Sequence, residues 1–598
     1  MKIINEIIDK AVAELQLPIC AYSVTHPKEE AHGDYSVNIA MILWKQISNQ
    51  KFSNSQIKSP RDLAQNIVDH INKGPSFVFE KVEVAGAGFI NFYLTKEYLL
   101  KELTNATNPS FGKNENLNKQ KTYVEFTDPN PFKEFHIGHL MSNTIGEALC
   151  RIFEANGAII KRANYQGDVG LHVAKSIWGL EQKLKKDGKQ LSDLQVLTLK
   201  ERIAYLGAAY AYGAGLYETD PTSPEGFAGA REEMNEMNGQ IYNRTNEQIN
   251  ELYDQGRAWS LEYFETIYAR LGTKFDEYFF ESEAGPAGLK VIEEALSKEV
   301  LELGDEGAVV FKGEKYGLHT RVFRNKLGLP TYEGKELGLP QMKYGRWAYD
   351  KSFIVTANEI DEYFKVLLKV LSLISPELGG KTTHLSHGMM KLTTGKMSSR
   401  TGKVVTGEGL LDELKETVLE KMGVREIKNK EVIADQVAVG ALKYTVLRQA
   451  LGGDIVYEPE KMTNLEGNTG PFIQYTHARA KSILNKFTLG VGPLKSEMLN
   501  PQEMSVLRWL YRYPEVVADA GSSFAPHLIA TYIYELASRF NSFYQACRVF
   551  EEDPTSPEGS AGARNGEVNA LRYELTRATA NVLKSGLGLL GITAPEEM

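Results

Sequence analysis

The chain has 598 residues, of which 42% are hydrophobic and 24% are charged, and its formal net charge is −9. This length predicts several domains of about 150 residues each, and the acidic balance argues against indiscriminate nucleic-acid binding without excluding RNA bound through a local patch. Its 3 cysteines lie far apart, which argues against disulfides and cysteine-rich zinc sites, and no apolar run approaches the roughly 18 residues of a membrane span. We therefore expect a soluble, intracellular protein.

Residues 1–115 are expected to form a separate α+β domain that ends in a linker. The runs 77–84 and 89–94 read as two strands, and the glycine-rich residues 85–88 between them predict a turn. Asn, Gly, Pro and Lys are frequent from 105 to 120, as in a linker. By composition alone, a generic α+β module fits this region equally well.

The stretch from Val124 to Tyr165 has the pattern of a βαβ unit. An apolar strand runs into an Asn-Pro-rich turn, His136 to His139 open an apolar helix, and Gly157 marks its end before a second strand. The end of the first strand and the start of the helix would form a crevice suited to phosphate, where two imidazoles could donate hydrogen bonds. The turn has neither the dinucleotide-binding nor the P-loop glycine pattern. Taken alone, such histidines are more often ordinary helix-start residues or half of a metal site.

The middle of the expected catalytic region (116–405), from about 175 to 297, reads as helical and heavily charged, as an insertion between two halves of a nucleotide-binding fold would be. Two Pro/Gly/Ser-rich stretches, 220–231 and 553–564, are nearly identical and predict exposed loops. Nothing in the sequence explains the duplication.

Residues 395–403 form a loop of small, hydroxylated and cationic side chains before the strand-like Val404 and Val405. Such a loop could close over a triphosphate, although a basic loop by itself is usually just solvated. Paired in this order, the two segments resemble the HIGH and KMSKS signatures of class I aminoacyl-tRNA synthetases. The first reads His136-Ile137-Gly138-His139, and the second reads Lys396-Met397-Ser398-Ser399-Arg400, with serine in place of the fourth-position lysine and arginine at the end.

After an expected connecting segment (406–435), residues 436–598 are mostly helical. Two apolar helix faces indicate a bundle; their members are Ile533, Leu536, Ala537, Phe540, Tyr544 and Cys547, and then Leu571, Leu575, Ala578 and Val582. The stretch 466–479 resembles the GNSGPYLQYAHAR sequence of arginyl-tRNA synthetases, and the tail 587–598 ends as those chains do. In the N-terminal domain, residues 32–35 and 84–92 resemble that family's HGDY and VAGPGFINF segments, with Ala87 in place of proline.

The resemblance covers nearly the whole chain and selects arginine among the class I enzymes. It implies an α/β fold: a Rossmann-like catalytic domain with a parallel sheet, flanked by the N-terminal α+β domain, which would bind tRNA, and a C-terminal all-α anticodon-binding bundle. The chain lacks the cysteine ligands that a cysteinyl enzyme needs for zinc. The spacing also leaves no room for the large editing domain of the valine, isoleucine and leucine enzymes.

The implied reaction ligates L-arginine to tRNA through an arginyl-adenylate formed from ATP. The resemblance implies that the ATP phosphates are bound by Lys133, His136, Gly138 and His139. Lys396 and Arg400 would stabilise the departing pyrophosphate, and Met397, Ser398 and Ser399 would complete the ATP-binding loop. Mg²⁺ would arrive with ATP on the phosphate oxygens, so no metal site of the protein's own is expected.

The resemblance also assigns the arginine pocket. Glu125 and Asn130 would hold the amino-acid head group; Tyr165, Asp168 and His172 would line the pocket, with His172 replacing the family's glutamine. Tyr332 and Glu336, four residues apart on one helix face, would hold the guanidinium, with Glu336 replacing the family's aspartate. Asn358 could add a further amide. The alternatives are a glycine-rich strand end at 166–170 and an exposed Tyr–Glu pair on a surface helix.

The expected partners are arginine-accepting tRNA and L-arginine, and no association with a membrane is expected. The protein is expected to be a monomer in the cytoplasm. The resemblance further implies that even the first step needs tRNA. Two other classes stay open: a catalytically idle tRNA-binding relative, and a small-molecule nucleotidyltransferase of the HIGH superfamily. Intact His136, His139 and Lys396 argue against the first, and the C-terminal bundle argues against the second. Adenylate formation in vitro would separate these possibilities.

Overall fold

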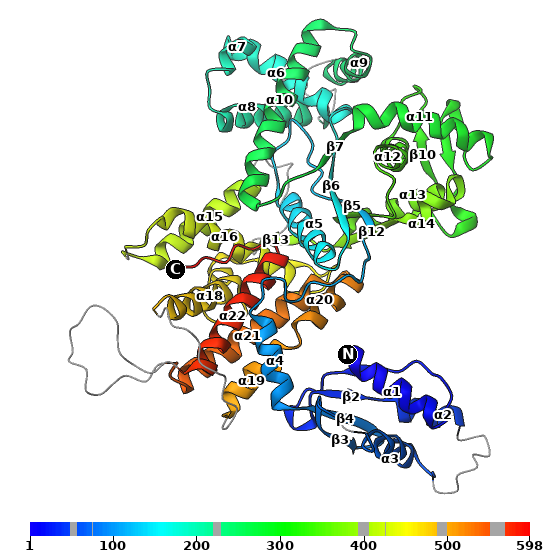
Figure 1. Ribbon diagram of the computed structural model, residues 1–598. Helices are drawn as coiled ribbons and strands as arrows, with labels where there is room; N and C mark the ends of the chain where they lie inside the picture. The colour runs from blue at the N-terminus through cyan, green and yellow to red at the C-terminus, as the bar shows by residue number, and fades with distance from the viewer. Residues whose placement is uncertain are drawn as a thin grey trace. The chain divides into compact units, whose positions relative to one another are not determined.

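The computed structural model describes residues 1–47, 57–74, 76–218, 229–392, 406–424, 426–486, 499–549 and 569–598. Its chain divides into two compact units, each described by itself below. Unit 1 comprises Met1–Gly112, Arg479–Val516 and Glu535–Leu583, and unit 2 comprises Lys113–Ala478, Val517–Tyr534 and Lys584–Met598 (Figure 1).

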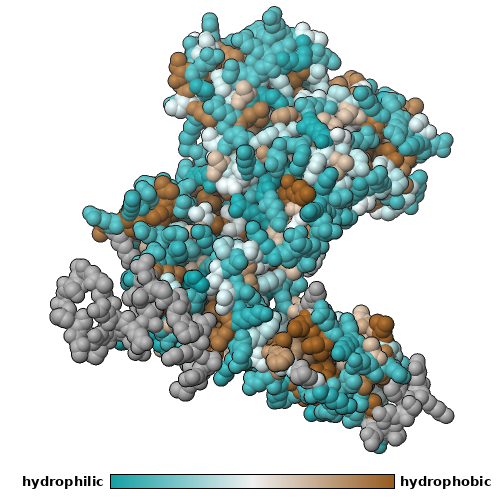
Figure 2. Space-filling view, in the orientation of Figure 1, coloured by the Kyte–Doolittle hydropathy of each residue, from teal (hydrophilic) through white to brown (hydrophobic). Residues whose placement is uncertain are grey.

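Unit 1 begins with a small antiparallel sheet in the strand order β1-β2-β4-β3, flanked by helices. The predicted hairpin is present as β3 and β4. The carboxylate of Asp34 is wholly buried and accepts a hydrogen bond from the Leu94 amide at 2.8 Å, which ties the start of β2 to the end of β4. The elements are α1 Lys2–Glu14, β1 Val24–Thr25, β2 Tyr35–Val37, α2 Ile39–Ile47, α3 Pro60–Ile71, β3 Phe79–Ala85, β4 Phe89–Leu94 and α4 Lys96–Ala106. Figure 2 shows a mostly hydrophilic face, with a hydrophobic patch over this part.

The C-terminal part of the chain is a set of helices, as predicted. Asn500 and Glu503 form a capping box that starts α19. The predicted apolar faces are buried, except that Tyr544 is 41% exposed. The helices are α18 Gly470–Asn485, α19 Pro501–Leu510, α20 Tyr513–Ser522, α21 Pro526–Ala546 and α22 Ala570–Leu589.

Unit 2 is built on a five-stranded parallel sheet in the order β12-β11-β5-β6-β7, which confirms the predicted α/β class. The strands are β5 Lys121–Glu125, β6 Ile159–Gln166, β7 Glu277–Phe280, β11 Lys351–Ala357 and β12 Thr382–His387. From β5 the chain first adds strands on one side and then returns to add β11 on the other. The carboxyl ends of β5 and β11 therefore flank a topological switch point, where ligands bind in open α/β sheets.

The predicted βαβ unit is β5–α5–β6, with α5 spanning Ile137–Ala155. Nearly every side chain of α5 is buried, because the helix lies against the sheet on one side and against α15 and α16 on the other. Gly157 has φ +91°, as expected of the residue that ends a helix. The sheet and α5 thus fix the position of the histidine turn at the start of α5.

The helical region between β6 and β7 consists of α6 Leu171–Asp187, α7 Leu191–Leu194, α8 Leu199–Glu218, α9 Ala230–Asn243 and α10 Glu247–Leu271. It ends earlier than the expected residue 297, because 277–280 form an edge strand of the sheet and α11 follows at once. The expected connecting segment is helical as well, in α15 Gly407–Met422 and the start of α16 Lys430–Leu447. Most of the duplicated stretches and the expected strand 404–405 lie outside the described residues.

The remaining elements of unit 2 surround the sheet. They are α11 Glu281–Ser297, β8 Glu302–Leu303, β9 Val309–Phe311, β10 Arg321–Arg324, α12 Tyr332–Arg346, α13 Asp361–Ile374, α14 Pro376–Lys381, β13 Met390–Leu392, β14 Ile455–Tyr457 and α17 Pro459–Met462. None of the described helices combines the length and apolar character that crossing a membrane requires.

Candidate active site

The turn between β5 and α5 has an unusual backbone that its surroundings hold in place. Thr127, Asp128 and Phe132 all have positive φ, at 80°, 45° and 68°, a conformation that costs about 1–3 kcal/mol per residue. The Ser142 hydroxyl accepts a hydrogen bond from the Thr127 amide at 2.9 Å, and the Ser260 hydroxyl accepts one from the Phe132 amide at 3.0 Å. A strained turn kept at a switch point indicates a functional site.

His136 and His139 form both the start of α5 and a stacked pair of rings, 3.6 Å between centroids. The Gly138 amide donates to His136 Nδ1 at 3.1 Å, and the His136 amide donates to His139 Nδ1 at 3.2 Å. Desolvation by the surrounding atoms, aided by the charge of Lys133, lowers the pKa of His136 to about 4 although its ring is partly open to solvent, and burial lowers the pKa of His139 well below its usual value. Both rings are thus neutral near pH 7, and with Nδ1 accepting, each carries its proton on Nε2.

Lys133 lies beside this pair and carries an unusually acidic ammonium group. Burial, with the nearby charge of Lys175, lowers its pKa to about 8. The ammonium lies 5.1 Å from the centroid of the Tyr210 ring on α8. Asn130, in the same turn, lies against Gly167, where a Cβ atom would come within 2.2 Å of its side-chain oxygen.

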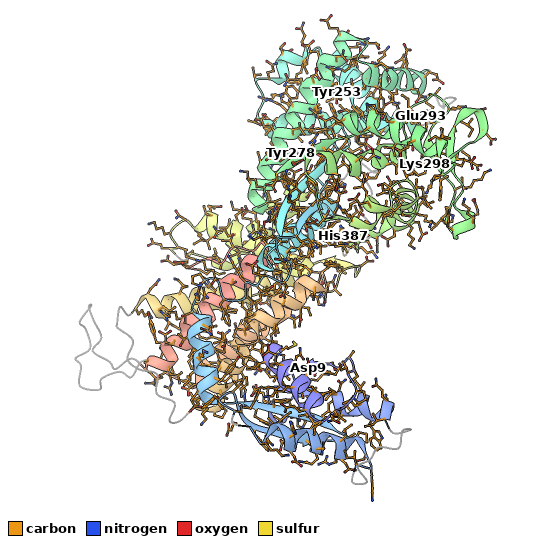
Figure 3. The ribbon with its side chains drawn as sticks, turned by 45° about the vertical axis from the view of Figure 1, so that its right-hand side comes forward. Asp9, Tyr253, Tyr278, Glu293, Lys298 and His387 are labelled. Carbon is orange, nitrogen blue, oxygen red and sulfur yellow. The ribbon has the colours of Figure 1, made fainter. Side chains whose placement is uncertain are left out.

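Asp168, in the segment after β6, was expected to line the arginine pocket, and in the structure its carboxylate makes contacts within the protein. That carboxylate is fully buried and already accepts hydrogen bonds from Tyr253 (Figure 3), Arg257 and, twice, Ser282 at 2.8–3.1 Å. Asp168 therefore fastens α10 and α11 to this loop. His172 Nε2 lies 2.8 Å from the Gly167 carbonyl, and burial lowers the pKa of His172 to about 3.

A cluster of largely buried carboxylates, called the acidic pocket below, lies between the sheet and α12. Its carboxylates are Glu125, Asp128, Glu281 and Glu336; Glu125 is ion-paired with Lys343 and Glu281 with Lys335. Glu336 is 8% exposed, and its Oε1 atom has no hydrogen-bond partner among the residues that the structure describes. Burial, and next Glu125, raise the pKa of Glu336 well above its usual value. Within the described part of the chain, the buried Tyr165 hydroxyl also has no hydrogen-bond partner. Four carboxyl groups thus share this region with two lysines, and a cationic ligand would find an acceptor in Glu336.

Tyr332 and Glu336 do lie one turn apart at the start of α12, as expected. Tyr332 is 56% exposed, and the Lys335 ammonium lies 4.8 Å from the centroid of its ring. Tyr332 also lines a cleft of about 380 Å³ together with His172 and Tyr242. Asn358 lies exposed at the end of β11. No sequence motif pointed to Asp128, Lys335 or Lys343 in this pocket, and Glu281 could be expected there only once β7 is placed in the sheet.

The expected loop residues Lys396, Met397, Ser398, Ser399 and Arg400 lie outside the described residues. The residues that follow them are described. Thr406 forms an isolated antiparallel bridge with His136, and the Gly407 amide donates to the Phe135 carbonyl at 2.6 Å. The chain thus leaves this loop directly beside the histidine turn.

Three family models match the chain and together span most of it. They are described as an arginyl tRNA synthetase N-terminal domain (residues 2–94), a class I (R) tRNA synthetase catalytic domain (103–458) and a DALR anticodon-binding domain (473–598).

Relatives and solved structures agree with these matches. The arginine–tRNA ligase of Fusobacterium nucleatum is 31% identical over 96% of this chain and 95% of its own length. That of Flavobacterium psychrophilum is 27% identical over 100% of this chain and 99% of its own. The arginyl-tRNA synthetase structures of Thermus thermophilus and Plasmodium falciparum both superpose with a TM-score of 0.77, at 23% and 20% identity. Each superposition covers 100% of this chain, and 100% and 99% of the two solved chains.

Proposed function

The chain belongs to the arginyl-tRNA synthetases, class I enzymes that use ATP to ligate arginine to tRNA, and we propose here which of its residues carry that reaction. The observation that supports the assignment most strongly is the pairing of two features at one switch point. One is the neutral histidine pair at the start of α5. The other is the acidic pocket, in which one carboxylate oxygen of Glu336 has no hydrogen-bond partner in the described ranges of the chain.

In the first step the arginine carboxylate attacks the α-phosphorus of ATP, and pyrophosphate leaves. We assign the Nε2–H groups of His136 and His139 to the phosphate oxygens, with Gly138 beside them and the Lys133 ammonium adding charge. Donors preorganised toward a developing negative charge accelerate a reaction without rearranging during it. Lys396 and Arg400, with Met397, Ser398 and Ser399, are proposed to close over the leaving pyrophosphate.

In the arginine pocket, Glu336 is proposed to pair with the guanidinium, and the Tyr332 and Tyr165 hydroxyls to complete its hydrogen bonds. A carboxylate and a guanidinium match each other in charge and in planar geometry. Asn130, and more weakly Asn358, are assigned to the head group of the amino acid. Glu125, already paired with Lys343, is proposed to set the charge of the pocket. Asp168 and His172 are proposed to hold the pocket loop in place.

Mg²⁺ is proposed to enter bound to the ATP phosphates as part of the substrate. The described residues contain no group of three or more His, Cys, Asp or Glu side chains arranged to hold a metal ion, and Mg²⁺ commonly binds through substrate phosphates. We also propose that the enzyme acts as a monomer in the cytoplasm, where its product is used for translation.

The Glu336→Gln variant tests the pocket assignment. Removing the charge from a carboxylate that binds a buried cation costs about 1.5–3 kcal/mol, so the KM for arginine should rise by one to two orders of magnitude, while the KM values for ATP and tRNA change little. Tyr332→Phe should cost less, about 0.5–1.5 kcal/mol. Glu336→Asp restores the family residue with a shorter arm and should also bind arginine less well.

The exposed Glu293 on α11 (Figure 3) gives a matched control, Glu293→Gln, which should leave arginine kinetics unchanged. Unchanged arginine kinetics in both Glu336 variants would show that another carboxylate holds the guanidinium.

A further inference from the structure

From the last turn of α22 onward, the end of the chain is held by side chains from three helices of unit 2. Four backbone carbonyls of this tail, defined here as residues 588–595, accept hydrogen bonds. The contacts are Arg151 Nη1 to Gly588 (3.1 Å), Lys443 Nζ to Gly591 (2.8 Å), Gln474 Nε2 to Thr593 (2.8 Å) and His477 Nδ1 to Pro595 (2.8 Å). Gln474 and His477 lie on α18, Lys443 on α16 and Arg151 on α5.

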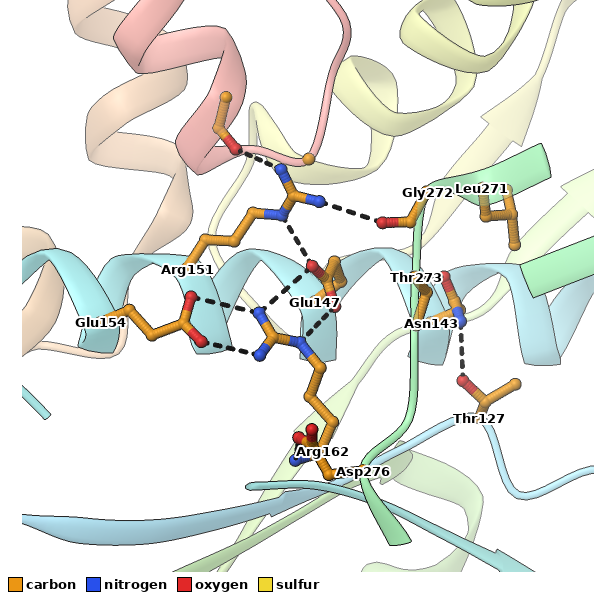
Figure 4. Close-up of polar contacts among 12 residues, drawn as sticks. Thr127, Asn143, Glu147, Arg151, Glu154, Arg162, Leu271, Gly272, Thr273 and Asp276 are labelled. Atoms are coloured by element: carbon orange, nitrogen blue, oxygen red, sulfur yellow. Dashed lines mark hydrogen bonds and ion pairs between the residues drawn. The ribbon is translucent and has the colours of Figure 1, made fainter. Parts of the chain in front are cut away.

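The same two cations also hold the turn that connects α10 to β7. Arg151 Nη2 donates to the Gly272 carbonyl at 3.0 Å, and Lys443 Nζ donates to the Leu271 carbonyl at 2.6 Å. Figure 4 shows Arg151 between the tail and this turn, with Glu147 accepting from its Nε atom at 2.7 Å. Each cation therefore joins the tail to the α10–β7 turn.

From that turn, buried hydrogen bonds continue to the strained turn before α5. Thr273 Oγ1 donates to Asn143 Oδ1 at 2.9 Å, and Asn143 Nδ2 donates to Thr127 Oγ1 at 3.0 Å (Figure 4). All three side chains are at most 5% exposed. Thr127 is one of the positive-φ residues and lies three positions before Asn130. We call this series, from the tail through Lys443 and Arg151 to Thr127, the tail relay.

Lys443 is unusual because its charged side chain is buried in the protein interior. It is 0% exposed, and the acceptors of its ammonium group are two backbone carbonyls. Burial, with the nearby charge of Arg151, lowers its pKa to about 7. A buried amine is costly unless it is hydrogen-bonded, and an apolar side chain could fill the same space. What an apolar side chain could not do is join the tail to Leu271.

We propose that the tail relay positions the turn that carries Asn130 for arginine activation, and that Lys443 is a positioning residue of the enzyme although it lies outside the substrate pocket. The proposal rests on the function assigned above. It also gives the region matched as anticodon-binding a physical connection to the active site, because α18 holds the distal half of the tail. A contiguous series of buried hydrogen bonds can carry such coupling, and its existence has to be tested by energetic coupling between its members.

The test compares Lys443→Met, Thr273→Val and the double variant with wild type, using the full-length enzyme and arginine-accepting tRNA. Misplacing a reacting group by about 1 Å can cost about 10²-fold in rate. We expect each single variant to lower kcat/KM for arginine about 10- to 100-fold while the KM for tRNA changes less than about threefold. The double variant should lose little more than the worse single variant, because both interrupt one series. Lys430→Met, at the exposed start of α16, is the matched control and should keep wild-type kinetics.

A lower melting temperature with wild-type arginine kinetics in Lys443→Met would show that the lysine only stabilises the fold and would overturn the proposal. Additive losses in the double variant would overturn it as well. If Lys443→Met does not fold, Thr273→Val alone decides: wild-type kinetics there reject the relay. Failure of wild type to charge arginine would instead refute the proposed function, so the two failures are distinguishable.

Discussion

At the scale of single residues, the ring nitrogens of His136 and His139 have two separate tasks. Each Nδ1 accepts a backbone amide and so completes the start of α5, which leaves each Nε2–H group free to point toward a ligand. The pattern of two histidines around a glycine predicted the helix start and the donors, but not the stacking of the rings or the depth of their pKa shifts. Those depend on the burial that the surrounding fold provides.

His139→Ala should lower the rate of arginine activation about 10²–10³-fold, the usual loss for a preorganised donor. Arginine binding should change far less. The variant also loses part of a helix cap, which costs about 0.5–2 kcal/mol of stability, so a thermal unfolding curve must accompany the kinetics. Single-turnover adenylate formation in the presence of tRNA measures the effect. A weaker ground-state affinity for ATP with unchanged turnover would mean that the histidine only binds substrate.

Lys133 should give the enzyme a basic limb in its pH profile. Because its pKa is lowered to about 8, the ammonium is charged below that pH and loses its charge as the pH rises through it. We expect kcat/KM for ATP to fall above about pH 8, and Lys133→Arg, which stays charged, to remove that fall. A flat wild-type profile up to about pH 9.5, or the same fall in the arginine variant, would show that Lys133 does not act through its charge.

Only part of the acidic pocket could be predicted from the sequence. Tyr332 and Glu336 were placed on one helix face because residues four apart share a face, and the structure places them there. Asp128 and Glu281 come from segments far from α12 in the chain, and the strand order of the sheet brings them to Glu336. Without that order, a carboxylate in a strand or turn cannot be told from a solvated one.

At the scale of elements, α11 and α12 approach each other unusually closely through glycines. A Cβ atom on Gly288 would come within 1.9 Å of the Gly334 carbonyl oxygen, and one on Gly338 within 2.5 Å of the Gly288 amide. This contact sets the position of α12 and hence of Glu336. The sequence predicts a helical insertion that extends through β7 to about residue 297. The strand β7 has only 4 residues and lies between two helices, so it is too short to show the alternating pattern of a strand.

Gly288→Ala should therefore raise the KM for arginine about tenfold and destabilise the protein by about 1–3 kcal/mol, as overpacking does. Gly345→Ala, on α12, where no atom of the described residues lies within 4 Å of the added Cβ, should stabilise it by about 0.5–1 kcal/mol and leave arginine kinetics alone. Urea unfolding and arginine titrations of both variants measure this. Equal behaviour of the two would show that the helix contact does not control the pocket.

At the scale of the whole molecule, the three kinds of domain were predicted from short motifs distributed along the chain, and the α/β class from the βαβ pattern. The helix α15 lies within the expected connecting segment 406–435, so helices begin before residue 436. The net charge of −9 means that tRNA must bind through local groups of cations.

The most direct measurement is to charge total tRNA with each of the twenty amino acids in turn, with ATP and Mg²⁺. We expect arginine alone to be esterified, and pyrophosphate exchange with arginine to be negligible until tRNA is added. Vigorous exchange without tRNA would contradict the second expectation. Robust charging of another amino acid, with none of arginine, would contradict the account of the pocket built around Glu336.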